Sequence, residues 1–182
     1  MADDFARLVS LACHDLRTPL ATVQGFAKTL VSMEDLDAEK RMRYLSLIDA
    51  SAEDLARLLD LLSLAARIEA GRYEPTLQEV DSLRLAPIGS SGTGAVVRAD
   101  PEPVARAIAS LQRAAARHGG VDVTVSVDGA EIAIEPVVAP AAPVVLGEEQ
   151  KDLGALVAMR LLRATGSQAA LDGERLVIRL PR

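Results

Sequence analysis

Residues 14–20 of this 182-residue chain read His14-Asp15-Leu16-Arg17-Thr18-Pro19-Leu20. They lie within residues 4–31, where apolar side chains recur every three to four positions, which predicts one long amphipathic helix. Asp3 and Asp4 stand where the start of a helix favours acidic side chains. A histidine beside an acid, followed by a basic residue and a hydroxyl, differs from the pattern of a buried helix face. Pro19 removes a backbone donor, so we expect a bend just after the histidine.

A second amphipathic helix is predicted over residues 38–70, after a polar break at residues 32–37. Asp37 is placed as its N-cap and Gly71 as its C-terminal stop. Because a short loop joins two helices of about 40–50 Å, they are expected to form an antiparallel hairpin. Two helices alone offer too little surface to cover both apolar stripes. We therefore expect a second copy to complete a dimeric four-helix bundle; the alternative is that the C-terminal half of the chain covers the hairpin.

After Arg72 the pattern changes to short strands and helices. Strands are expected at residues 74–80, 96–99, 121–127, 131–135, 169–171 and 175–180, and helices at about 101–117 and 153–164. Asp128-Gly129 and Asp172-Gly173 mark the turns of two hairpins. The fold class predicted is therefore α+β with two domains, a long helical hairpin over residues 1–71 and a small α/β sandwich over residues 72–182.

The composition excludes several classes of function. The net charge is −6, and the chain has two Phe, two Tyr and no Trp, which argues against a nucleic-acid partner. No run of about 18 uncharged apolar residues is present, so no membrane span is expected. The acidic N-terminus lacks the basic flank of a secretion signal, and we expect a cytoplasmic location. The single cysteine, Cys13, forms no disulfide within the chain and is expected to be packed.

The stretch from His14 to Leu20 resembles the H-box of sensor histidine kinases, the helix that carries the phospho-accepting histidine. Residues 67–71, Arg-Ile-Glu-Ala-Gly, are also similar to the end of the second helix in that family. The resemblance implies that His14 is the nucleophile and that Asp15 orients its ring. It also implies that Arg17 reaches phosphoryl oxygens and that Thr18 helps to position water for removing phosphate from a partner. Taken singly, each of these residues could be an ordinary exposed helix residue, and the combination carries the interpretation.

The resemblance continues through residues 72–182, but three nucleotide-binding sequence boxes are missing. The chain contains no Asn, and Ser110 and Ala114 stand where the family has two Asn, the second of which binds Mg²⁺. Residues 134–140 lack the Asp and the glycines of the next box. Residues 151–155 hold one glycine where the family has a phosphate-binding loop, which needs several close backbone N–H groups. The resemblance therefore implies a degenerate ATP-binding domain, closest to that of kinase-like histidine phosphotransferases.

These observations predict a histidine phosphotransferase of a two-component phosphorelay. It moves a phosphoryl group between receiver-domain aspartates through His14 without using ATP. We expect no cofactor bound by this chain, because Mg²⁺ would come from the receiver domain. The expected partners are response regulator receiver domains, an upstream hybrid kinase and a second copy of the chain. Two alternatives stay open: an active ATP-dependent histidine kinase with an atypical nucleotide site, and a non-enzymatic scaffold or inhibitor that docks on a kinase or receiver domain.

Overall fold

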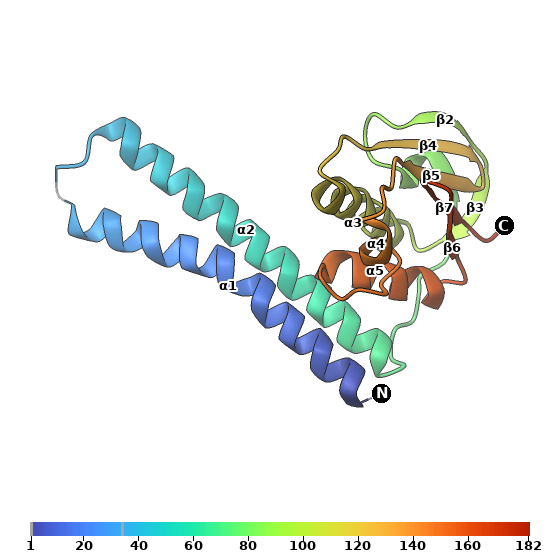
Figure 1. Cartoon of the computed structure of the whole chain (residues 1–182), viewed down its shortest axis with the longest axis horizontal. Coiled ribbons are helices and arrows are strands. Elements are labelled where there is room, and N and C mark those ends of the chain that lie inside the picture. Colours follow the sequence, from blue (N-terminus) through green and yellow to red (C-terminus); the bar gives the residue numbers. More distant parts are fainter. Residues whose placement is uncertain (1, 34) are drawn as a thin grey trace. The chain divides into compact units, whose positions relative to one another are not determined.

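The structure is a computed structural model that describes residues 2–33 and 35–182, and the side chains of these residues from Ala6 onward (Figure 1). It divides into two compact units, Met1–Ser63 and Leu64–Arg182. The division falls inside the second long helix, because the last turns of that helix pack on the core of the second unit. The domain boundary predicted from the sequence lies at the end of that helix, between residues 71 and 72, and stays a prediction. The proposed capping by Asp3 and Asp4 lies outside the described side chains.

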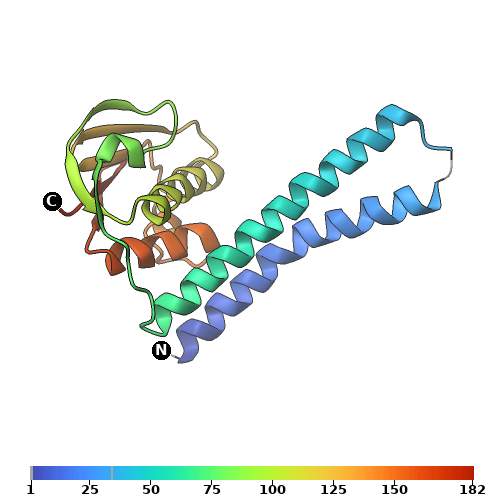
Figure 2. The same cartoon turned by 180° about the vertical axis from the view of Figure 1, so that it is seen from behind.

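The first unit is an antiparallel hairpin of α1 (Ala2–Ser32) and most of α2 (Ala38–Glu69), close to the predicted bounds. Asp37 caps α2 as expected, since its Oδ1 accepts a hydrogen bond from the backbone N–H of Lys40 at 2.8 Å. That bond is the largest cause of the lowered pKa of Asp37. Phe26 and Tyr44 stack with ring centroids 4.9 Å apart and join the two helices. Figures 1 and 2 both show α1 changing direction part way along, and Pro19 lies inside this helix.

The second unit is built on a mixed sheet of five strands in the order β2-β4-β5-β7-β6. The strands are β2 (Ser91–Gly94), β4 (Thr124–Gly129), β5 (Glu131–Glu135), β6 (Gln168–Asp172) and β7 (Arg175–Arg179). β2 pairs with β4 in parallel, and the other pairs are antiparallel. β1 (Gln78–Asp81) and β3 (Val96–Ala99) form a separate antiparallel ribbon, joined through the 3-10 helix η1 (Ser82–Leu85) and β2.

Three helices gather on one face of this sheet in Figures 1 and 2: α3 (Pro101–Gly119), α4 (Ala142–Val145) and α5 (Leu153–Ala164). Their buried side chains and the inward side chains of β4, β5 and β7 form one hydrophobic core of Leu, Ile, Val, Ala and a methionine. A helical hairpin followed by an α/β unit with a mixed sheet is the predicted α+β arrangement. None of the described helices is both long enough and apolar enough to cross a membrane.

Two details of the second unit differ from the prediction. The strand expected at residues 74–80 begins only at Gln78, because the backbone N–H of Thr76 bonds the Asp100 carboxylate at 3.2 Å and not a neighbouring strand. β2 lies in a Gly/Ser-rich run for which no strand is predicted. Gly92 has φ 111°, and a Cβ there would lie 1.9 Å from the Val127 carbonyl oxygen. Only glycine therefore permits the close pairing of β2 with β4.

Candidate functional site

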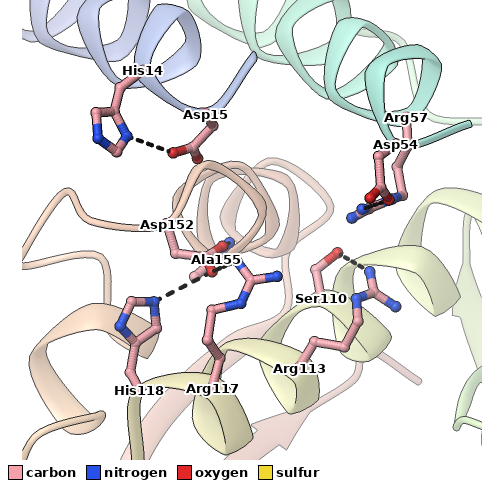
Figure 3. A network of polar contacts seen from close by, with 10 residues as sticks. All are labelled: His14, Asp15, Asp54, Arg57, Ser110, Arg113, Arg117, His118, Asp152 and Ala155. Atoms are coloured by element: carbon pink, nitrogen blue, oxygen red, sulfur yellow. Dashed lines mark hydrogen bonds and ion pairs between the residues drawn. The ribbon is translucent and has the colours of Figure 1, made fainter. Parts of the chain in front are cut away.

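His14 projects from α1 with 77 % of its side chain exposed. Its Nδ1 lies 3.1 Å from Oδ1 of Asp15, whose side chain is 22 % exposed (Figure 3). Because a carboxylate only accepts hydrogen bonds, this contact favours the tautomer with the ring proton on Nδ1. Nε2 then carries the lone pair, on a ring that is largely open to solvent. The arrangement is that of an oriented imidazole nucleophile.

Arg17 and Thr18 lie one turn further along α1, three and four residues after His14, and both are exposed on the same side of the helix. The Thr18 carbonyl accepts a hydrogen bond from the Thr22 hydroxyl at 3.1 Å. The Thr18 hydroxyl itself makes no hydrogen bond within the described residues, so it is available to a partner or to water. The structure thus brings the four predicted site residues together. The packed position expected for Cys13 is wrong, because this residue is exposed.

A shallow groove of about 570 Å³ continues along α1 from the site. It is lined by Arg17, Thr18, Ala21, Thr22, Gly25, Phe26 and Thr29. A Cβ added at Gly25 would meet no other atom within 4 Å, so the groove is open at this point. Small and hydroxyl-bearing side chains next to an exposed histidine leave room for the surface of another protein to approach Nε2.

A second polar cluster, not predicted from the sequence, lies in the second unit (Figure 3). Asp152 is buried and caps α5, since its Oδ1 accepts a hydrogen bond from the Ala155 N–H at 3.0 Å. Its Oδ2 lies 3.2 Å from Nη1 of Arg117 and 3.4 Å from Nε2 of His118, a contact without hydrogen-bond alignment. One carboxylate therefore joins the end of α3 to the start of α5. In the sequence, an Asp before an apolar helix indicates a helix cap. The contact of Asp152 with Arg117, 35 residues earlier, has no such signal in the sequence.

The positions compared above with the two Asn of the kinase family are both buried in the second unit. Ala114 belongs to the hydrophobic core, and Ser110 accepts a hydrogen bond from Arg113 at 3.0 Å. A Cβ added at Gly154 would lie 3.4 Å from the Ser110 Cβ, so the start of α5 packs directly on α3. Further along, Val137, Ala141, Val144 and Val145 are buried in the same core. Among the described residues, no group of three His, Cys, Asp or Glu side chains could hold a metal ion.

Substitution of Asp152 is expected to lower the stability of the second unit. Asp152→Ala removes the cap of α5 and the ion pair with Arg117, and we expect a loss of about 1–2 kcal/mol in the free energy of unfolding. Asp152→Asn keeps a good cap but loses the charge, so it should cost less than the alanine variant. Urea unfolding of both variants measures the difference. Equal stability of the wild type and Asp152→Ala would show that the cluster does not hold α3 to α5.

Comparisons with known proteins point to one family. Residues 6–71 match the His Kinase A (phospho-acceptor) domain. An uncharacterized sensor-like histidine kinase of Rhizobium meliloti is 33 % identical over 78 residues, which is 42 % of this chain and 15 % of the relative. The probable sensor histidine kinase TcrY of Mycobacterium tuberculosis is 35 % identical over 66 residues, 36 % of this chain and 14 % of TcrY. The chain thus spans about one seventh of the length of these relatives.

The fold is also that of a solved histidine kinase. The structure of Acinetobacter baumannii histidine kinase AdeS superposes with a TM-score of 0.61 over 92 % of this chain and 97 % of that one, at 17 % sequence identity. The hairpin and the α/β unit therefore follow a histidine kinase arrangement. The comparisons thus place a phospho-acceptor domain match in residues 6–71 and a histidine kinase fold over most of the chain.

Proposed function

We propose that this protein is a histidine phosphotransferase that passes a phosphoryl group between receiver-domain aspartates through His14 without using ATP. The observation that carries the proposal is the contrast between the two units. His14 is 77 % exposed and oriented by Asp15, whereas apolar and helix-to-helix packing surrounds the positions of the missing nucleotide boxes. The phospho-acceptor chemistry is present, and the groups that would draw phosphate from ATP are replaced.

The transfer step follows from the tautomer of His14. The Nε2 lone pair attacks the phosphorus of an aspartyl phosphate, the bond from phosphorus to the aspartate oxygen breaks, and the aspartate leaves as a carboxylate. The ring, which keeps its proton on Nδ1, gains a positive charge as the Nε2–phosphorus bond forms. Asp15, 3.1 Å from Nδ1, stabilises that charge. The reverse step, on the aspartate of a second receiver domain, regenerates neutral His14.

The remaining groups of the site act on the phosphoryl oxygens and on water. Arg17 lies on the same side of α1 as His14 and balances the charge of the transferring group. The unbonded hydroxyl of Thr18 positions a water molecule when the phosphate of the receiver is hydrolysed. Mg²⁺ comes with the receiver domain, which also contributes its aspartate, so catalysis here consists mainly of orienting the reacting groups. The groove from Arg17 to Thr29 receives that partner.

Packing in the second unit supports the absence of a nucleotide site. An Asn side chain at position 114 would have to enter the hydrophobic core. At the start of α5, where the helix N-terminus would favour a phosphate, Asp152 already supplies an anion to the Ala155 N–H. Val144 and Val145, which follow the second missing box at residues 134–140, are buried rather than free to cover a ligand.

We further propose that two copies pair through their hairpins into a four-helix bundle. Val9, Leu20 and Val31 are exposed on α1 and follow one another at intervals of eleven residues, or three helical turns. They therefore form a stripe along one side of the helix. His14 is about 140° around the helix from Val9, at 100° per residue, so a second copy that covers the stripe leaves the histidine accessible.

Substitution within this stripe is expected to separate the two copies. Leu20→Glu would place a charge in the interface of each copy and should weaken dimerisation by at least about 100-fold. Ser10→Glu, about a quarter turn away from the stripe, is the matched control and should leave the dimer intact. Sedimentation velocity at micromolar concentrations distinguishes the two. A monomeric wild-type chain, or a Leu20→Glu variant that dimerises normally, would contradict the bundle.

The alternative function is an ATP-dependent histidine kinase, and the superposition of both units on AdeS favours it. The two functions differ in the source of the phosphoryl group. Incubation of the purified chain with labelled ATP and Mg²⁺, without any partner, is expected to leave His14 unlabelled. Stable label on His14 under these conditions would support the kinase and overturn the proposal.

A further inference from the structure

The last turns of α2 are integrated into the second unit. Leu64 and Ile68 pack against its hydrophobic core, and Ala65 is fully buried. Glu69 forms an ion pair with Arg160 of α5, whose side chain is only 11 % exposed. Since this pair is largely sheltered from water, it is screened less than a surface pair. Apolar packing and an ion pair therefore both attach the end of α2 to the second unit.

The segment after α2 is held as well. The Tyr73 hydroxyl donates a hydrogen bond to Oδ2 of Asp100 at 2.8 Å, and the Thr76 N–H donates to the same oxygen at 3.2 Å. The guanidinium of Arg67 lies 5.6 Å from the centre of the Tyr73 ring, a cation–π contact. Burial, together with the bond to Asp100, raises the pKa of Tyr73, which keeps this hydroxyl protonated as a donor.

Asp100 itself departs from the role that its sequence position suggests. It precedes α3 and is the N-cap residue, but its side chain makes no capping hydrogen bond. Its carboxylate is instead directed to Tyr73 and Thr76, 27 and 24 residues earlier in the chain. A good helix cap is thus used to bind the connecting segment.

The turn between these contacts is closed by its own backbone. Arg72 N–H donates to the Arg67 carbonyl at 2.9 Å and Gly71 N–H to the Ile68 carbonyl at 3.0 Å. Gly71 has φ 62°, the left-handed conformation that ends a helix in this manner. These bonds fix the path of the chain between Glu69 and Tyr73.

We propose that two contacts, Glu69 with Arg160 and Tyr73 with Asp100, form a clamp that holds residues 64–76 in the second unit. The connection after α2 is then a fixed part of this unit rather than a flexible linker. A movement of the second unit then acts directly on the end of α2, the helix that pairs with the one carrying His14. This inference rests on contacts within the second unit and does not depend on the proposed phosphotransfer.

Amide hydrogen exchange of the full chain, followed by mass spectrometry, tests the clamp. In the wild type, peptides covering residues 70–76 are expected to exchange as slowly as neighbouring peptides of the second unit. The double variant Tyr73→Phe with Glu69→Ala removes one hydrogen bond and one ion pair, and exchange in this segment should become about tenfold faster. Tyr73→Phe alone should give about a fivefold increase. Tyr44→Phe, in the hairpin, is the matched control and should change nothing in this segment.

The outcomes decide the inference as follows. Acceleration confined to residues 64–76, with slow exchange kept in α5, supports the clamp. Rapid exchange of residues 70–76 in the wild type overturns it, and so does an unchanged rate in the folded double variant. Should the double variant unfold as a whole, the Tyr73→Phe variant decides: local acceleration supports the clamp, and no acceleration overturns it.

Discussion

His14→Gln is expected to lose the ability to accept a phosphoryl group, with a rate of transfer at least about 1000-fold below that of the wild type. Glutamine is polar and of similar size but offers no nitrogen lone pair for attack on phosphorus. The histidine is 77 % exposed, so its replacement leaves the packing of the hairpin intact. The rate is measured by mixing the chain with a phosphorylated receiver domain and recording how fast the receiver loses its phosphate.

The chain provides a matched control for this substitution. His118, the second of its two histidines, lies in the other unit beside Asp152, and the proposed transfer does not use it. His118→Gln makes the same chemical change and should leave the rate within about twofold of the wild type, because the proposed transfer depends on the His14 nucleophile alone. Normal transfer by His14→Gln, or an equal loss in both variants, would remove His14 as the phospho-acceptor.

Ala114→Asn should destabilise the second unit strongly and gain no affinity for ATP. Ala114 lies on α3 and is fully buried in the hydrophobic core of the second unit. A larger polar amide at this place overpacks the core and finds no hydrogen-bond partner, so we expect a loss of about 2–4 kcal/mol. Urea unfolding measures the stability, and titration with Mg-ATP measures the binding.

An Asn introduced on the exposed side of α3 is the control for the stability loss of Ala114→Asn. Arg106→Asn introduces Asn on the surface of that helix, and the expected cost is below about 1 kcal/mol, from helix propensity and a surface ion pair. An Ala114→Asn variant that is as stable as Arg106→Asn and binds Mg-ATP would show that a nucleotide pocket persists between α3 and α5.

The helices could be predicted closely from the sequence because their signals are local. The range of α5 follows from its apolar period and the Asp before it, and α2 follows from the cap at Asp37 and the stop at Gly71. β2 could not be predicted, since Ser and Gly have low strand propensity and this strand exists through its pairing with β4. The late start of β1 has a similar origin, in the bond from Thr76 to a residue far along the chain.

For the polar sites, too, the sequence predicts local groupings of residues but not contacts between residues that are far apart along the chain. His14, Asp15, Arg17 and Thr18 are neighbours on one helix, so their spacing alone predicts that they lie together. The cluster of Asp152 with Arg117 and His118 and the clamp of Tyr73 with Asp100 join residues that are far apart in sequence. Those contacts depend on the tertiary packing of α3, α5 and the end of α2, for which a single sequence carries no direct signal.

The most direct test of the central claim is transfer without nucleotide. The purified chain is mixed with a phosphorylated receiver domain and Mg²⁺ in the absence of ATP, and acid-labile phosphate is located by tandem mass spectrometry. The account predicts phosphate on residue 14 within minutes and its passage to a second, unphosphorylated receiver. Phosphate that never leaves the first receiver, or that reaches His14 only when ATP is added, would contradict it.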